Sequence, residues 1–331
     1  MPVLPAAVGP AKHKTGGKLD ALSDNVCFRI LVIFEEDKGY RIKDKGSQVF
    51  AIPGSSSCIL YPVSFTNMNS DSPIGIFDSG VGGLSILERI HQLLPVENLI
   101  YMADSANAPY GPKGDVFIVE RSRQIMDFFV SKNAKVVVVA CNTATAAAVN
   151  TLREEYEMPI IGMEPAIKPA ASESKTGVIG VLATEGTLAS DKFVDLKSRF
   201  DGKVEIITQP CPGLVEEIEK IKTDKATVKK LLQQYIPPLL EKGADTLVLG
   251  CTHYSFIRAL VKEVAGESVA IVDTDDAVAR RLKAVLKEEK ITGAAQGKIT
   301  FYSSGDIGNQ AILISNKWGA DVSIQSFNED H

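Results

Sequence analysis

The sequence predicts an α/β fold with two pseudo-symmetric α/β domains, mostly parallel sheets, an active site in the cleft between the domains and an irregular N-terminal extension. Three observations support this prediction. Short apolar runs alternate with amphipathic stretches from Ser72 onward, the pattern of βαβ units on a parallel sheet. Two motifs of the first half recur in the second half. The 331 residues, 45% hydrophobic and 23% charged, also have the length and composition of one large or two ordinary globular domains.

The predicted strands are short apolar runs bounded by polar residues, Gly or Pro. In chain order they are Ile74–Phe77, Leu99–Met102, Lys135–Ala140, Ile160–Gly162, Val178–Leu182, Val204–Thr208, Thr246–Leu249, Val269–Val272 and Ile299–Tyr302. Helical patterns fill most of the connections, and Lys225–Lys242 is one of the clearer predicted helices. Since crossovers between parallel strands are right-handed, we expect the carboxyl ends of the strands in each sheet to share one edge.

The repeat consists of two pairs of matching segments. Ile74–Gly80 resembles Ile179–Glu185, and Val138–Thr143 resembles Val248–His253. Related α/β domains often face each other across a pseudo-twofold axis, with a small-molecule cleft at the carboxyl ends of their strands. The predicted division is an N-terminal extension over residues 1–71, a first α/β domain over residues 72–165 and 276–331, and a second over residues 166–275.

The extension lacks the βα alternation of the remaining chain. Its strand-like stretches are Phe28–Phe34 and Ile59–Tyr61, and turn-forming residues gather at Pro53–Ser57. Three interpretations are open: a small β-rich extension, a poorly ordered tail, or a misassigned start that leaves Met68 as the true first residue.

The composition excludes several classes of protein. The net charge is −5, so a global electrostatic grip on nucleic acid is not expected. No apolar run approaches the ~18 residues of a membrane span. Five cysteines are too few for a disulfide scaffold, and their number is odd, so they cannot all pair. This composition favours a reducing cytoplasm.

Cys141 and Cys251 occupy matched places in the repeat. Each follows an apolar strand and a small residue, and each precedes hydroxyl or amide residues and a helical pattern. Both thiols are therefore predicted at the mouth of a sheet near a helix N-terminus, where a thiol pKa is lowered and N–H groups can bind an anion. A lone cysteine is usually a buried small hydrophobe, but a repeated pair favours chemistry. Cys27, Cys58 and Cys211 lack this setting and are interpreted as inert.

Signatures of a metal or a nucleotide cofactor are missing from the sequence. There are only four histidines, and neither Cys-x-x-Cys nor His-x-x-x-His occurs. The glycine-rich run Asp78–Gly83 has neither Gly-x-Gly-x-x-Gly nor Gly-Lys-Ser/Thr spacing. It suits a small carboxylate or ammonium group near the backbone, and no cofactor and no metal are expected.

Several polar residues follow predicted strands. Asp78 is either a general acid–base partner or a helix N-cap, with equal support for the two interpretations. His253, two residues past Cys251, is either placed to reach a substrate or is a surface histidine at a helix N-terminus. The loop Asp104–Gly111 is an ordinary turn or presents the phenol of Tyr110 to a ligand. Further polar residues at strand ends are Glu164, Thr184 and Thr187.

At these residues the chain resembles the glutamate racemase family, the cofactor-independent amino-acid racemases of bacterial cell-wall synthesis. The resemblance covers about residues 73 to 320, in the family's order. The matching motifs are Gly75–Gly83, Pro109–Gly111, Ala140–Ala144 and Gly250–Tyr254, with weaker matches at Glu164–Pro165, Ala183–Thr187 and Ser303–Asp306. Ser255 stands where the family usually has Pro, and the loop at Asp104 also departs from the common pattern. The family begins just before the first motif, which favours Met68 as the start.

Racemisation requires that an α-proton be removed from one face of a carbon and replaced on the other. Two bases on opposite walls of a cleft can do this without moving the substrate. The resemblance implies that Cys141 acts on D-glutamate and Cys251 on L-glutamate, with Asp78 and His253 as their partners. The substrate-binding residues that it implies are Asp78, Ser79, Tyr110, Gly111, Asn142, Thr143, Glu164, Thr184, Thr252 and His253.

The resemblance further implies a cytoplasmic homodimer that supplies D-glutamate for peptidoglycan synthesis. Three rival functions stay open. An aspartate or hydantoin racemase would also use two cysteines, a Cys–His hydrolase would use only one, and an amino-acid-binding or partner-inhibiting protein would use none for chemistry. Fold analogy alone does not decide among them.

Overall fold

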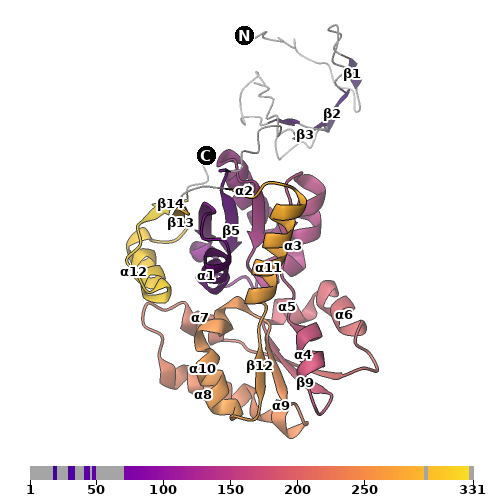
Figure 1. The fold of residues 1–331 in the computed structure, drawn as a ribbon, viewed down its shortest axis with the longest axis vertical. Coiled ribbons are helices and arrows are strands. Elements are labelled where there is room, and N and C mark those ends of the chain that lie inside the picture. Colours follow the sequence, from indigo (N-terminus) through magenta and orange to yellow (C-terminus); the bar gives the residue numbers. More distant parts are fainter. Residues whose placement is uncertain are drawn as a thin grey trace. The chain divides into compact units, whose positions relative to one another are not determined.

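The computed structural model describes residues 71–293 and 297–327, together with four short strands nearer the N-terminus (Figure 1). These strands pair antiparallel in the order β1-β2-β3-β4. Their bounds are Lys18–Asp20, Arg29–Ile33, Arg41–Asp44 and Ser47–Val49. The strand predicted at Phe28–Phe34 is therefore confirmed as β2. The stretch Ile59–Tyr61, Cys27 and Cys58 lie outside the described residues.

The first of two parallel sheets has six strands in the order β14-β13-β6-β5-β7-β8. Their bounds are β5 Ile74–Asp78, β6 Leu99–Ala103, β7 Val136–Val139, β8 Ile160–Ile161, β13 Ile299–Ser303 and β14 Ile324–Ser326. The sequence predicted all of these strands except β14. The three residues of β14 are half-buried or exposed and form no apolar run.

The second sheet has four parallel strands in the order β10-β9-β11-β12. Their bounds are β9 Val178–Ala183, β10 Glu205–Pro210, β11 Thr246–Leu249 and β12 Ala270–Val272. This order matches β6-β5-β7-β8 strand for strand, so the repeat seen in the sequence extends to topology. The predicted α/β class with two mostly parallel sheets is confirmed, whereas the exact domain boundaries stay a prediction.

Helices cover both faces of each sheet (Figure 1). They are α1 Leu84–Leu93, η2 Ser105–Asn107, α2 Asp115–Ser131, α3 Asn142–Glu155, α4 Ile167–Glu173, α5 Glu185–Ala189, α6 Asp191–Ser198, α7 Leu214–Ile218, α8 Lys225–Tyr235, α9 Pro237–Glu241, η3 Thr252–Ile257, α10 Arg258–Ala265, α11 Asp275–Glu288 and α12 Ile307–Trp318, where η marks a 3₁₀ helix. The single helix predicted over Lys225–Lys242 was wrong, because the chain forms α8 and α9. Pro237 and Pro238 have no N–H to continue the hydrogen-bond ladder of α8.

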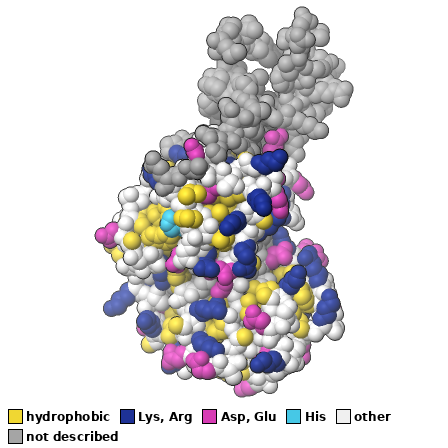
Figure 2. Space-filling view, in the orientation of Figure 1, with side chains coloured by type: hydrophobic (Ala, Val, Ile, Leu, Met, Phe, Trp, Pro, Cys, Tyr) yellow, Lys and Arg dark blue, Asp and Glu magenta, His cyan; other side chains and the backbone are white. Residues whose placement is uncertain are grey.

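Alternating residues of each central strand enter different hydrophobic clusters. In β5, Ile74 and Ile76 pack in the cluster on one face of the sheet, and Phe77 packs on the other. Strands buried on both faces appear in sequence as unbroken apolar runs such as Val136–Val139, which explains why they could be found. No helix in the described part of the chain has the length and apolar character needed to cross a membrane. On the face shown in Figure 2, basic and acidic side chains are interspersed.

Asp275 lies where the chain returns from the second sheet to the first. Its side chain is buried next to Ser85 of α1 and Ser255 of η3, with Asp273 and Arg258 as its charged neighbours. Burial, followed by the charge of Asp273, raises the pKa of Asp275 to about 6. The Ser255 hydroxyl, at a position where Pro was expected from the family pattern, is thus part of the polar surroundings of this carboxyl.

We expect Asp275→Asn to stabilise the protein above pH 6. The folded state binds this proton more tightly than the unfolded state, so the contribution to stability is complete below pH ~4 and is lost as the pH rises through about 6. The loss at pH 8 is about 2–3 kcal/mol, which Asn avoids. Urea unfolding should show a difference from the wild type at pH 8 that vanishes at pH 4. The exposed neighbour Asp276, changed to Asn, is the control, and an equal gain at both pH values would refute this interpretation.

Candidate active site

A small cavity lies between the carboxyl ends of the two sheets. Both Cys141, which follows β7, and Cys251, which follows β11, line it. Its other lining residues are Ser79, Pro109, Tyr110, Gly111, Asn142, Thr143, Thr184, Val215, Thr252 and His253. The structure thus brings together the two thiols and eight of the ten residues predicted to bind substrate.

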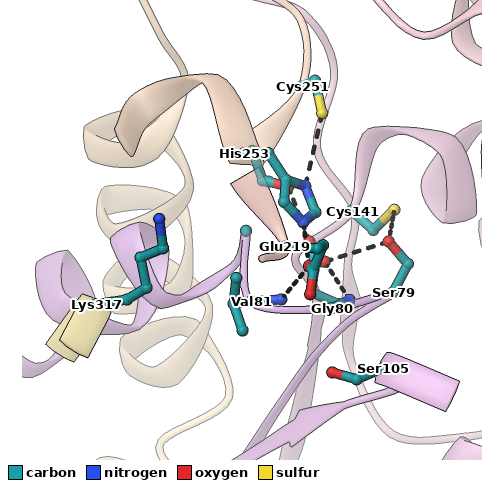
Figure 3. Close-up of polar contacts among 12 residues, drawn as sticks. Ser79, Gly80, Val81, Ser105, Cys141, Glu219, Cys251, His253 and Lys317 are labelled. Carbon is teal, nitrogen blue, oxygen red and sulfur yellow. Dashed lines mark hydrogen bonds and ion pairs between the residues drawn. The ribbon is translucent and has the colours of Figure 1, made fainter. Parts of the chain in front are cut away.

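Cys141 is the N-cap of α3 and begins a chain of hydrogen bonds. Its sulfur accepts from the backbone N–H of Ala144 at 3.4 Å, and its S–H donates to Ser79 Oγ at 3.8 Å (Figure 3). Ser79 in turn donates to Asp78 Oδ1 at 3.3 Å. Asp78 lies fully buried beneath the cavity and also accepts from Gly80 N–H and from Thr252 Oγ1, at 2.7 and 2.9 Å. The N-cap interpretation considered for Asp78 is wrong, because the helix that follows it, α1, has Gly83 at its N-cap.

The predicted lowering of the thiol pKa is wrong for Cys141. Burial, followed by the charge of Asp78, raises the pKa of Cys141 to about 12, and the hydrogen bond from Ala144 offsets this only in part. Burial also raises the pKa of Asp78 itself. Removing a thiolate from water costs more here than one helix N–H returns. The Cys141 thiol therefore holds its proton.

Cys251 is followed by the short 3₁₀ helix η3 rather than directly by an α-helix. Its Sγ lies 3.8 Å from His253 Nδ1, and His253 Nε2 lies 2.5 Å from Glu219 Oε1. Burial alone would lower the pKa of His253, but the hydrogen bonds with Cys251 and Glu219, together with the charge of Glu219, raise it well above its usual range. The Cys251 side therefore carries an imidazolium between a sulfur and a carboxylate.

Glu219 is the functional residue that sequence reasoning missed. It lies at the C-terminal end of α7, and its Oε1 also accepts from the backbone N–H of Val81 at 2.8 Å (Figure 3). Burial opposes its ionisation, yet the hydrogen bond and charge of His253 hold the pKa of Glu219 below its usual value. Glu219 is distant in sequence from His253 and belongs to no motif, so only the tertiary structure reveals this pair.

The glycines that follow β5 allow the two walls to approach closely. A Cβ at Gly80 would lie 1.9 Å from Glu219 Oε1, and one at Gly82 would lie 2.4 Å from Thr252 Oγ1 and 2.5 Å from His253 Nδ1. These distances are shorter than any real contact of a Cβ atom. The glycine run therefore has a steric role, in making room for the Cys251 wall.

Asn142 and Thr143 offer polar atoms to the cavity. Both polar atoms of the Asn142 amide are buried without a hydrogen-bond partner, although its side chain lines the cavity. Buried polar groups are rarely left unpaired, so this amide indicates a site for a polar ligand. Thr143 Oγ1 lies 3.0 Å from Thr184 Oγ1 and 3.2 Å from Thr187 Oγ1, which connects the two walls.

Tyr110 is held in the cavity wall by a buried ionic cluster. Its hydroxyl donates to Asp104 Oδ2 at 2.6 Å, and Arg121 of α2 donates to both oxygens of Asp104 at 2.9 and 2.8 Å. Ser304 donates to the same carboxylate at 2.7 Å. The loop Asp104–Gly111 is therefore more than an ordinary turn, because it anchors a lining residue.

Glu164 lies apart from the thiols. It lines a second cavity, of about 220 Å³, with Arg153, Lys192 and Arg281 among its neighbours. Its carboxylate lies 3.7 Å from Lys192 Nζ and is 39% exposed. Of the residues predicted to bind substrate, Glu164 is the one that the structure places away from the thiol cavity.

Comparison with known proteins identifies the class. The Asp/Glu/Hydantoin racemase family model matches residues 74–282. The chain belongs to this family of α/β racemases. A glutamate racemase from Stutzerimonas stutzeri (strain A1501) is 50% identical over 257 residues, which cover 77% of this chain and 97% of the relative. The similarity to this glutamate racemase thus extends over almost the whole length of the relative.

Two solved structures support the same placement. Glutamate racemase isoform RacE1 from Bacillus anthracis has a TM-score of 0.71 and 30% identity, and the match covers 78% of this chain and 98% of that one. Escherichia coli glutamate racemase, solved with L-glutamate and the activator UDP-MurNAc-ala, has a TM-score of 0.67 and 32% identity, with coverage of 77% and 98%.

Proposed function

We propose that this chain interconverts L-glutamate and D-glutamate by a two-base mechanism, with Cys141 and Cys251 as the bases and with no cofactor. The observation that carries the proposal is that two thiols from equivalent strands of the repeat line one small cavity. The resemblance to glutamate racemases indicates that the substrate is glutamate. The unpaired amide of Asn142 offers a hydrogen-bond donor and an acceptor for the polar groups of glutamate.

The two thiols differ in their surroundings. Cys141 is linked through Ser79 to the buried Asp78, and its thiol holds its proton. Cys251 Sγ lies 3.8 Å from Nδ1 of His253, whose imidazolium is the partner on this side of the cavity. One protonated and one deprotonated thiol is the pair that two-base racemisation needs.

Each proton step follows from this pairing. The Cys251 thiolate takes the α-proton of L-glutamate as the Cα–H bond breaks, and the electron pair is left on the α-carbon and its carboxylate. The Cys141 S–H then delivers its proton to the opposite face, which yields D-glutamate and a Cys141 thiolate. D-glutamate reacts through the same steps in reverse. Donors preorganised around the α-carboxylate stabilise the charge that builds up in the transition state.

Circular dichroism of the purified protein with each enantiomer tests the proposal. Solutions of L-glutamate and of D-glutamate should both lose their optical activity, without added pyridoxal phosphate or metal. L-aspartate in parallel distinguishes an aspartate racemase, and binding of glutamate without any change in optical activity would indicate a binding protein. Either result in place of glutamate racemisation overturns the proposal.

The wider role follows from the resemblance to glutamate racemases. We propose that the D-glutamate serves peptidoglycan synthesis in the cytoplasm and that the protein acts as a homodimer. A strain that lacks the protein should grow only when D-glutamate is supplied. Sedimentation of the purified chain should give the mass of a dimer.

A further inference from the structure

Lys317 is a half-buried cation at the end of α12. This helix packs on the first sheet through Leu313 and Ile314. The Lys317 ammonium contacts the connection between α7 and α8, where Nζ donates to Thr223 Oγ1 at 3.1 Å. Nζ also lies 5.0 Å from the ring centroid of Phe256, within the range of a cation–π interaction.

Both contacts belong to segments that carry catalytic partners. Thr223 follows Glu219 in the connection after α7, and Phe256 follows His253 in η3. Glu219 and His253 are the two residues whose side chains meet at 2.5 Å behind Cys251. A single ammonium from the first sheet thus touches both segments that form this pair, and Figure 3 shows Lys317 with the same group of residues.

The charges around Lys317 fit such a role. Glu219 is its anionic neighbour from α7, and the charge of Lys317 helps to hold the pKa of Glu219 below its usual value. Burial lowers the pKa of Lys317, and the charge of Glu219 opposes this. Glu219 is also paired with the imidazolium of His253. Lys317 therefore favours the ionised Glu219 that the imidazolium requires.

We infer that Lys317 is a positioning residue for the Cys251 base: by holding the Thr223 connection against η3, it keeps Glu219 aligned on His253, and His253 on Cys251. The inference rests on the proposed two-base function. According to this inference, α12, which packs on the first sheet, helps to position the Cys251 thiol that follows β11 of the second sheet.

The test is Lys317→Met, which keeps an unbranched side chain one atom shorter and removes its charge. We expect kcat/KM to fall roughly tenfold for both enantiomers, because a catalytic group is displaced. We also expect the pKa of His253, followed by ¹⁵N NMR and assigned with His253→Asn, to fall. The sign is diagnostic, because a cation that acted only through its charge would raise this pKa when removed.

Two variants complete the experiment. Lys317→Arg keeps the charge and should restore most of the activity and the pKa of His253. Lys283→Met removes an exposed lysine of α11 and should change neither. An unchanged or raised pKa of His253 in Lys317→Met overturns the inference, as does a loss of activity that Lys317→Arg does not restore. If the wild type fails to racemise glutamate, the proposed function falls, while the NMR titration still decides the role of Lys317.

Discussion

Racemisation is expected to fall about 10²–10⁴-fold when either Cys141 or Cys251 is changed to Ser. A serine hydroxyl is far less acidic than a thiol, so the variant loses one of its two general bases, and general acid–base catalysis contributes about 10²–10⁴-fold. Because the other thiol remains, each variant should keep exchange on one side. Cys141→Ser should exchange the α-hydrogen of L-glutamate with D₂O, and Cys251→Ser that of D-glutamate, as followed by ¹H NMR.

Cys211→Ser provides the control for this pair. Cys211 is also buried and, like Cys141, has a pKa raised by burial to about 12, but it does not line the cavity. Its replacement should leave racemisation unchanged. Racemisation that survived in both Cys141→Ser and Cys251→Ser would remove the two-base mechanism, and equal exchange of both enantiomers in each variant would remove the assignment of one thiol to each face.

The second large effect is expected from Gly82→Ala, which we predict to lower kcat about 100-fold. The added Cβ would lie 2.5 Å from His253 Nδ1 and 2.4 Å from Thr252 Oγ1. One of the two walls must move, and a displacement of about 1 Å at a catalytic group can cost ~10² in rate. Steady-state kinetics with both enantiomers measures the effect.

Gly114→Ala is the matched control, because nothing lies within 4 Å of the Cβ that it adds. It should leave kcat unchanged. If Gly82→Ala kept the wild-type kcat, the close approach of the glycine run to His253 would have no catalytic importance.

Some elements of the fold could be predicted from the local sequence pattern and others could not. Thr246–Leu249 was predicted to the residue, because three apolar residues after Thr246, bounded by Asp245 and Gly250, identify a strand that is buried on both faces. The break in the predicted helix at Pro237 could also have been predicted from the sequence, since two adjacent prolines cannot continue a helix. The strand β14 could not be predicted from the sequence, because it forms by pairing with β13 and its own hydrophobic pattern is weak.

The sequence by itself determined the α/β class, the repeat and the two cysteines, since apolar periodicity and matched motifs are local properties of the chain. It did not determine the protonation of the thiols, because burial raises the pKa of Cys141 where a helix N-terminus predicts a lower value. Only the tertiary structure paired Glu219 with His253 and moved Glu164 away from the thiols. Such pairings depend on how distant segments meet when the two sheets pack, and no local pattern in the chain records that.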